Sequence, residues 1–274
     1  MKILDWNPGK DTLLKGKEIE VHEIYHSHLA SQELTKAKIL KNSKRRMRAR
    51  SLEKALRKIG KPLNGKVLEL GAGDGWCSAY MLSKYYAQLS EMHTMEINPA
   101  AINQLIPKVF DVVGVNTEKS TLIHGSFNNI QLENYYDYVI VMGAIHHSSN
   151  LYRTFMEIQK ALKPGGWLIA QEPYMLDDTM NSFYTNRQNK VDNFKGLTEV
   201  RNGDRSDIFF RSCEYRAAAF HAGFDYQTFE IPDLSLWHFK RTLLGQNFGR
   251  PKNMTIYAQK PLKGLQLPTP TGWE

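Results

Sequence analysis

The sequence predicts an α/β fold, with a mostly parallel sheet of seven strands and helices on both faces. Two observations predict it. Short apolar runs alternate with helical patterns between residues 65 and 260, and glycine or proline marks many of the turns between them. Strands separated by helices require right-handed crossovers, which make the strands parallel and cover both faces of the sheet. In such sheets ligands bind at the carboxyl ends of the strands, where the strand order reverses.

Three regions are expected along the chain. Residues 1–61 are expected to form an N-terminal helical extension, because apolar residues recur at helical spacing from Ala49 to Ile59 and Gly60 is suited to end a helix. Residues 62–261 are expected to form the main domain. Residues 262–274 contain two prolines and predict an extended or disordered tail.

Within the main domain, local patterns in the sequence predict each strand and helix. Asn98 and Pro99 combine a helix N-cap with proline at the first helical position, and Gly114 is suited to the end of that helix. The strands are predicted at residues 66–70, 92–97, 121–124, 138–142, 167–171, 224–231 and 254–259. The helices are predicted at residues 75–88, 99–113, 151–162 and 213–221.

Composition excludes several classes of protein. The chain has 274 residues, 42% of them hydrophobic, which is enough for one sizeable core. The longest apolar stretch, residues 138–145, is too short to cross a bilayer, and the first residues lack the apolar region of a secretory signal. The two cysteines, Cys77 and Cys213, cannot build a disulfide framework or a four-thiolate metal site. We therefore expect a cytoplasmic protein with no metal and no membrane partner.

The positive charge is local. Residues 36–61 contain 12 basic residues and one acidic residue, a net charge of +11, whereas the whole chain carries +8. The remaining residues therefore carry a slight negative charge. The basic character belongs to one segment, which weakens any inference from the overall charge to nucleic-acid binding.

A glycine-rich turn follows the first predicted strand, with the sequence Glu69-Leu-Gly-Ala-Gly-Asp-Gly75. Glycines allow a sharp turn and a close approach of a ligand to the main chain. A dinucleotide fingerprint would place a third glycine at the position of Trp76, and a P-loop would need Gly-Lys-Ser/Thr, so neither is present. By itself, a tight turn between a strand and a helix would explain the glycines equally well.

Glu96 ends the second predicted strand, 21 residues after Gly75. A carboxylate at this place can accept hydrogen bonds from both hydroxyls of a ribose. A surface glutamate at a strand end is the alternative, but the combination with the glycine turn favours the binding role.

Together with later motifs, these residues resemble the class I S-adenosylmethionine-dependent methyltransferases, which have a Rossmann-like fold. The matching segments are Val67–Gly75 for the first motif, Met95–Asn98 for the acidic second strand, Asp137–His147 for the fourth strand, Leu162–Leu168 for the turn before strand five and Phe220–Phe224 for the entry to strand six. The resemblance covers residues 65–261 and implies the fold and S-adenosylmethionine as the cofactor. It leaves the substrate open.

The resemblance also implies roles for individual residues. It implies that Ser126 and Phe127 flank the adenine, although many members of the family have Asp where Ser126 stands, and that Gly143 lies beside the reacting centre. The other implied cofactor-binding residues are Glu69, Gly71, Ala72, Gly73, Asp74 and Gly75 for the amino-acid end, and Glu96, next to Ile97, for the ribose.

His146 and His147 directly follow the fourth predicted strand. Methyl transfer from a sulfonium is a direct displacement, so the protein mainly aligns the acceptor and excludes water. An alcohol or phenol acceptor gains from a base with a pKa near 7, which a histidine supplies. The alternative is that these side chains only pack near the cofactor. Of the two histidines, analogy favours His147 as the base.

Two long inserts, at about residues 174–211 and 232–252, are expected to form a lid over the site. Both combine aromatic and basic residues, which suits a small organic acceptor that is anionic or sugar-like. The candidate substrate-binding residues are Tyr174, Tyr184, Arg211 and Trp237.

Three functions remain open at this level. The first is methyl transfer to an oxygen or nitrogen of a small organic acceptor. The second is methylation of RNA or protein through the basic segment 36–61, which would make nucleic acid a partner. The third is a non-catalytic scaffold that binds the cofactor, which the intact glycines and Glu96 disfavour. The sequence does not indicate an oligomeric state.

Overall fold

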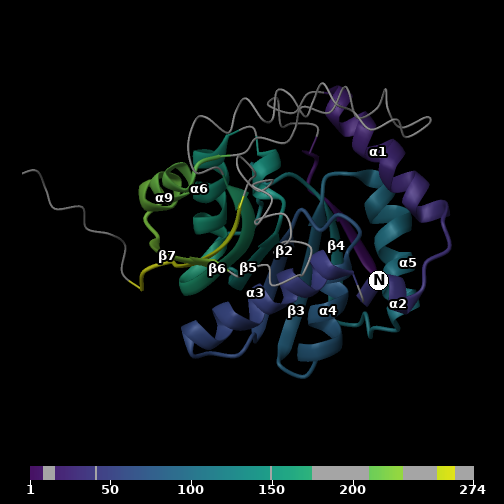
Figure 1. Ribbon diagram of the computed structural model, residues 1–274, viewed down its shortest axis with the longest axis horizontal. Helices are drawn as coiled ribbons and strands as arrows, with labels where there is room; N and C mark the ends of the chain where they lie inside the picture. The colour runs from purple at the N-terminus through teal and green to yellow at the C-terminus, as the bar shows by residue number, and fades with distance from the viewer. Residues whose placement is uncertain (9–15, 41, 149, 175–209, 231–251, 263–274) are drawn as a thin grey trace, which may run out of the picture.

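Eight strands in the described part of the chain pair into one sheet (Figure 1). The computed structural model describes residues 1–8, 16–40, 42–148, 150–174, 210–230 and 252–262. The strands are β1 (Lys2–Asp5), β2 (Gly65–Leu70), β3 (Leu89–Glu96), β4 (Ser120–His124), β5 (Tyr136–Met142), β6 (Leu162–Tyr174), β7 (Asp225–Glu230) and β8 (Lys252–Gln259). They lie in the order β1-β4-β3-β2-β5-β6-β8-β7.

The sheet is mostly parallel, as predicted. Among the described strands, only β8 runs antiparallel to its neighbours β6 and β7. The described sheet has one strand more than the seven predicted, because β1 pairs in parallel with β4, from Lys2 opposite Thr121 to Asp5 opposite His124. The N-terminal extension therefore contributes a strand as well as helices.

Helices cover both faces of the sheet. They are α1 (Gly16–Ser31), α2 (Lys36–Leu40), α3 (Ser43–Ile59), α4 (Trp76–Tyr85), the π-helical segment η2 (Ala101–Leu105) that continues into α5 (Ile106–Val113), the short helix η3 (Ile145–His147), α6 (Leu151–Ala161) and α9 (Ser212–His221). None of the helices in the described ranges is both long and apolar enough to span a bilayer.

The helix ends follow the signals in the sequence. The Asn42 side chain accepts a hydrogen bond from the backbone N–H of Lys44, and Gly60 ends α3 with a φ of 73°. Asn98 Oδ1 accepts from the backbone N–H of Ala100, which confirms its capping role. The predicted continuous helix over 99–113 contains the π-helical turn η2, which the sequence did not reveal. Pro107 explains it, since proline cannot donate the regular backbone hydrogen bond inside a helix.

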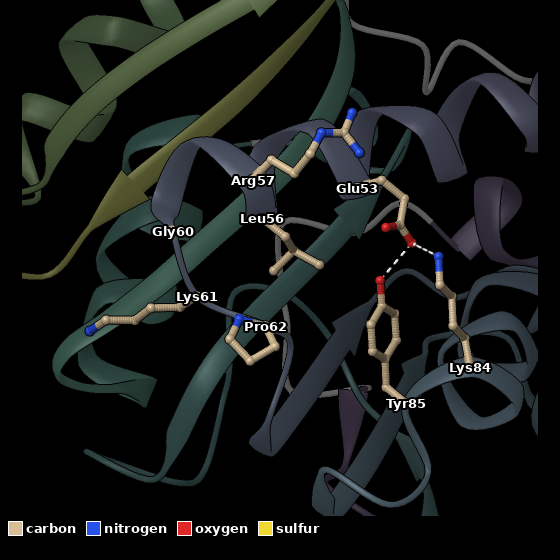
Figure 2. A pocket seen from close by; sticks show the side chains of 8 residues that line it. All are labelled: Glu53, Leu56, Arg57, Gly60, Lys61, Pro62, Lys84 and Tyr85. Atoms are coloured by element: carbon tan, nitrogen blue, oxygen red, sulfur yellow. Dashed lines mark hydrogen bonds and ion pairs between the residues drawn. The ribbon is translucent and has the colours of Figure 1, made fainter.

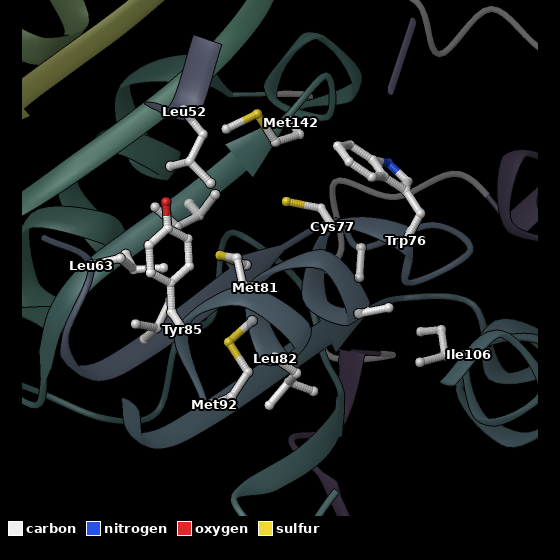
Figure 3. Packing of buried hydrophobic residues seen from close by; sticks show 14 of the residues in the cluster. Leu52, Leu63, Trp76, Cys77, Met81, Leu82, Tyr85, Met92, Ile106 and Met142 are labelled. Atoms are coloured by element: carbon white, nitrogen blue, oxygen red, sulfur yellow. The ribbon is translucent and has the colours of Figure 1, made fainter. Parts of the chain in front are cut away.

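The core has two layers, one on each face of the sheet. Alternate residues of β5 face opposite layers: Ile140 and Met142 pack with α3, α4 and α5, whereas Val139 and Val141 pack with α6 and α9. Figure 3 shows the first layer, in which Leu52 of α3 lies with Met142 and with Cys77 and Met81 of α4. The N-terminal extension thus packs directly into the core of the main domain.

The strand order reverses between β2 and β5. The chain runs from β2 to β3 and β4 on one side of β2, and then crosses to β5 and β6 on the other side. Residues that follow β2, β3, β4 and β5 lie at the same edge of the sheet because these strands are parallel. This edge is where a parallel sheet of this kind binds ligands.

Candidate functional site

The glycine turn after β2 packs closely against the segments that follow β4 and β5. Gly71 has a φ of 65°, and a Cβ atom there would lie 2.4 Å from Cβ of Ala144 and 3.0 Å from Cε1 of Phe127. Only glycine fits both the backbone conformation and the space. The turn, Phe127 and Ala144 therefore meet at one place, as the sequence predicted for the carboxyl edge.

Glu96 at the end of β3 is bound to the glycine turn. Its Oε2 accepts a hydrogen bond from the backbone N–H of Gly73 at 2.8 Å, and its Oε1 accepts from the N–H groups of Ile97 and Asn98 at 2.9 and 3.2 Å. A carboxylate can accept more than these three bonds. The carboxylate is thus fixed beside the turn with acceptor capacity left.

A buried polar atom next to Glu96 lacks a partner within the described part of the chain. Asn98 is fully buried, its Oδ1 caps the following helix, and its Nδ2 has no hydrogen-bond partner among the described residues. A buried amide donor without a partner is costly, so it indicates a polar group that binds there. Gly73 adds open space, because no atom of the residues that the structure describes lies within 4 Å of where its Cβ would be. These features fit a hydroxylated ligand such as the ribose of a nucleoside.

Glu69 lies inside β2 and is 2% exposed. Ser78 of α4 donates a hydrogen bond to its carboxylate. Burial raises the pKa of Glu69 to about 8, although the Ser78 hydrogen bond opposes the shift. Glu69 is therefore mostly uncharged at pH 7, and its implied role at the amino-acid end of the cofactor stays a prediction.

Asp74, in the glycine turn, forms an ion pair with Arg45 of α3. Its other oxygen accepts from the backbone N–H of Trp76 at 3.3 Å, and Arg45 also donates to the carbonyl of Ile39 at 2.8 Å. The contact attaches the N-terminal extension to the turn. Asp74 was predicted as a cofactor-binding residue, and in the structure its carboxylate also anchors α3.

Ser126 and Phe127 follow β4 at the same edge. Ser126 is buried, and its Oγ accepts a hydrogen bond from the backbone N–H of Asn128 at 3.2 Å. The Phe127 ring lies against Gly71. Both residues lie near the predicted cofactor site, and their contacts with the adenine stay predictions.

Glu172, near the end of β6, organises the segment after β5. It is fully buried and accepts hydrogen bonds from the backbone N–H groups of Ala144 and Ile145, both at 2.9 Å. Nδ1 of His146 lies 2.8 Å from its Oε2. Burial alone would raise the pKa of Glu172, but the hydrogen bond and the charge of His146, with the two backbone donors, hold it below its usual value.

Glu172 was not predicted from the sequence, in which its only signal is an acidic residue next to the buried run 168–171 of β6. Because the carboxylate is ionised and has no proton to give, the proton of this hydrogen bond belongs to Nδ1 of His146. When the ring is neutral, Nε2 is the nitrogen that can accept a proton; when Nε2 is protonated, the ring carries the charge that acts on Glu172. This arrangement is what a general base requires.

The two candidate histidines differ in their surroundings. The ring of His146 is 4.2 Å from that of His147, measured between centroids. His146 is buried and bonded to Glu172, whereas His147 is only partly buried. The pairing with a buried carboxylate distinguishes His146, although analogy at the sequence level favoured His147.

The predicted substrate-binding residues are only partly described. Tyr174 is buried at the end of β6, and its hydroxyl donates to Glu230 of β7. Arg211 precedes α9 and contacts Glu214. Tyr184 and Trp237 lie outside the described residues, as do most of the two predicted lid inserts. No three metal-binding side chains come together among the residues that the structure describes.

A pocket of about 350 Å³ lies beside the C-terminal end of α3, at the amino ends of the strands (Figure 2). Its lining residues are Glu53, Leu56, Arg57, Gly60, Lys61, Pro62, Lys84 and Tyr85. Glu53 accepts hydrogen bonds from Tyr85 and Lys84, at 2.5 and 2.6 Å, and so links α3 to α4. Pro62 precedes β2, which places the pocket at the amino ends of the strands, away from His146.

Comparison with known proteins identifies the family of the chain. A family model described as a methyltransferase domain matches residues 42–226. The curated reducing polyketide synthase ppsB of Aspergillus oryzae is 30% identical over 117 residues, which are 39% of this chain and 4% of that protein. The chain therefore spans only a small part of this relative.

Two solved structures show the same fold. A "putative sarcosine dimethylglycine methyltransferase" from Galdieria sulphuraria is 18% identical, with a TM-score of 0.63 over 89% of this chain and 99% of that chain. Phosphoethanolamine N-methyltransferase 2 of Haemonchus contortus, in complex with S-adenosyl-L-methionine, is 15% identical, with a TM-score of 0.56 over 78% of this chain and 53% of that chain.

Proposed function

The chain belongs to the methyltransferase-domain family, and on this basis we propose that it moves a methyl group from S-adenosylmethionine to an oxygen or nitrogen of a small organic acceptor. The Rossmann-like fold and the S-adenosylmethionine cofactor are those of the family. The nature of the acceptor is our inference. It rests on His146 as a candidate base at the site. It also rests on the contacts that basic residues of segment 36–61 make within the protein itself.

The cofactor site is built from the carboxyl ends of three strands. When bound, S-adenosylmethionine supplies an electrophilic methyl group on a positively charged sulfur. Glu96 and Asn98 would hold the ribose, since both have hydrogen-bonding capacity left beside open space at Gly73. The glycine turn would bring backbone N–H groups and the start of α4 to the amino-acid end.

The observation that carries the chemical part of the proposal is the hydrogen bond between His146 and Glu172. His146 takes a proton from the acceptor on Nε2, while Nδ1 keeps its own proton in the bond to Glu172. The buried carboxylate stabilises the imidazolium that forms. An acceptor that must lose a proton on methylation, such as a hydroxyl group, benefits most from this base.

Binding of the cofactor product tests the first part of the proposal. Titration of S-adenosylhomocysteine in a calorimeter is expected to show binding to the wild type and at least about tenfold weaker binding to Glu96→Gln, because hydrogen bonds to a charged acceptor contribute about 1.5–3 kcal/mol each. Glu133→Gln is the matched control, since the exposed Glu133 carboxylate pairs with Lys160 at the surface. No binding to the wild type would contradict the proposal.

Methylation of RNA or protein is less well supported, because several basic residues of segment 36–61 are used inside the protein. Arg45 pairs with Asp74, and the ammonium groups of Lys54 and Lys58 lie 4.5 and 5.8 Å from the centre of the Phe229 ring. A gel shift with total RNA separates the readings. Binding that falls steeply with salt would favour a nucleic-acid partner, and none at low salt would favour the small acceptor.

The acceptor itself can be identified by incubating the enzyme and methyl-labelled cofactor with a cell extract. We expect the label in the small-molecule fraction rather than in RNA or protein. A cytoplasmic location is part of the proposal and is supported by the two cysteines, neither of which forms a disulfide.

A further inference from the structure

Arg48 of α3 lies directly against Gly143, the residue that follows β5. A Cβ atom at Gly143 would be 2.1 Å from Nη2 and 2.8 Å from Cζ of Arg48, so the guanidinium packs onto the bare α-carbon. Gly143 has a φ of 80°, a conformation that favours glycine. The absence of a side chain at Gly143 is therefore what makes room for this cation.

The position of Arg48 is fixed from both sides. One turn earlier, Arg45 is ion-paired with Asp74 in the glycine turn. One turn later, Leu52 is fully buried in the core with Met142, the last residue of β5. Since α3 is held at both points, the Arg48 guanidinium stays at the carboxyl edge of the sheet. Gly143, against which it packs, lies three residues before His146 in the chain.

Arg48 has no carboxylate partner among the residues that the structure describes, although its side chain is partly buried. The neighbouring acidic side chains either have another partner or carry little charge. Asp74 pairs with Arg45, Glu172 binds His146, and Glu69 is mostly uncharged. A cation withdrawn from water without a counter-ion is unfavourable, which indicates that a ligand supplies the negative charge.

From this geometry we propose that Arg48 binds the carboxylate of a ligand that lies against Gly143. The planar guanidinium matches a carboxylate with two parallel hydrogen bonds. The inference rests on the proposed function, because that function supplies two sources of the carboxylate: the amino-acid end of the cofactor and an acid group on the acceptor. In either case Arg48 would position the ligand relative to His146.

Calorimetry with three proteins tests the proposal: the wild type, Arg48→Met, and Arg46→Met as the matched control on the exposed face of the same helix. The first ligands are S-adenosylhomocysteine and its decarboxylated analogue. If the cofactor supplies the carboxylate, Arg48→Met binds S-adenosylhomocysteine at least tenfold more weakly and binds the analogue like the wild type. Arg46→Met should behave as the wild type with both ligands.

If the acceptor supplies the carboxylate, Arg48→Met binds S-adenosylhomocysteine normally. Benzoate is then titrated into the protein saturated with S-adenosylhomocysteine, with the neutral benzamide as its counterpart. The wild type is expected to bind benzoate and not benzamide, and Arg48→Met should lose the difference. Arg48→Lys, which keeps the charge but not the planar donor pair, should recover part of the binding and shows that lost binding does not reflect misfolding.

Identical binding of all ligands to Arg48→Met and the wild type would overturn the proposal. A wild type that binds no S-adenosylhomocysteine would contradict the proposed function instead. In that case benzoate titrated into the unliganded proteins still decides the role of Arg48, because a difference between wild type and Arg48→Met supports the site and no difference refutes it.

Discussion

Nδ1 of His146 lies 2.8 Å from Oε2 of Glu172, across the junction between the segment after β5 and the adjacent strand β6. The same carboxylate holds the backbone N–H groups of Ala144 and Ile145. One buried side chain therefore fixes both the path of this segment and the proton position on the histidine.

His146→Ala is expected to lower turnover by about 100-fold or more, because general bases contribute about 10²–10⁴-fold. Affinity for S-adenosylhomocysteine should change little. The measurement is steady-state kinetics with the identified acceptor, combined with calorimetry. His147→Ala is the control, and it should keep most of the turnover. A large loss in His147→Ala alone would assign the base to His147.

Glu172→Gln is expected to reduce turnover while the fold is kept. The amide oxygen can still accept from Ala144 and Ile145, but the amide NH₂ would donate to Nδ1 of His146 and move the ring proton to Nε2, where it blocks the base. The pH–rate profile should lose the dependence on an unprotonated base. A variant with the wild-type profile would show that the pair is structural.

Glu69→Gln should change the pH dependence of stability. In the unfolded chain Glu69 releases its proton near pH 4.5, whereas in the folded protein it keeps the proton up to about pH 8. Folding of the unliganded wild type is therefore opposed increasingly as pH rises from about 5 to 8. Relative to the wild type, Glu69→Gln should gain unfolding free energy over this window, on the order of a few kcal/mol. Denaturant unfolding at several pH values measures it, and a constant difference would contradict the shifted pKa.

Gly71→Ala should destabilise the protein more than Gly114→Ala. Both residues have positive φ, at 65° and 75°, so both substitutions carry backbone strain of about 1–2 kcal/mol. Only at Gly71 would the new Cβ also collide with Ala144 and Phe127, whereas at Gly114 no described residue has an atom within 4 Å of it. The collision should add about 1–3 kcal/mol and weaken S-adenosylhomocysteine binding. Thermal unfolding measures the stability of both variants, and calorimetry measures their affinity for S-adenosylhomocysteine. Equal losses of stability and affinity in Gly71→Ala and Gly114→Ala would contradict close packing of the glycine turn.

Much of the main domain could be predicted from the sequence because its signals are local. Buried parallel strands are apolar runs, and Asn98, Gly60 and Gly114 mark helix ends with side-chain or backbone chemistry of their own. Strand β1 gave no such signal. It has four mostly exposed residues, and its partner β4 lies more than 100 residues further along the chain.

The site was predictable only in part, because some of its contacts join residues far apart in the sequence. The glycine turn and Glu96 form a pattern along the chain, so their proximity could be expected. Glu172 meets His146 because Met142 pairs with Gln171 in the sheet, and this register cannot be read from the sequence. Arg48 stands in a run of basic residues that resembles a solvated helix face, and only the packing of α3 distinguishes it.

The attachment of α3 matters for anyone who shortens this protein for expression. A version starting at Lys61 would retain β2 through β8, the glycine turn and both histidines. It would nevertheless lose Leu52 and Leu56 from one core layer, the counter-ion of Asp74 and the guanidinium at Gly143. Such a fragment should expose apolar surface on α4 and aggregate, so a minimal catalytic unit has to include the helix from Asn42 onward.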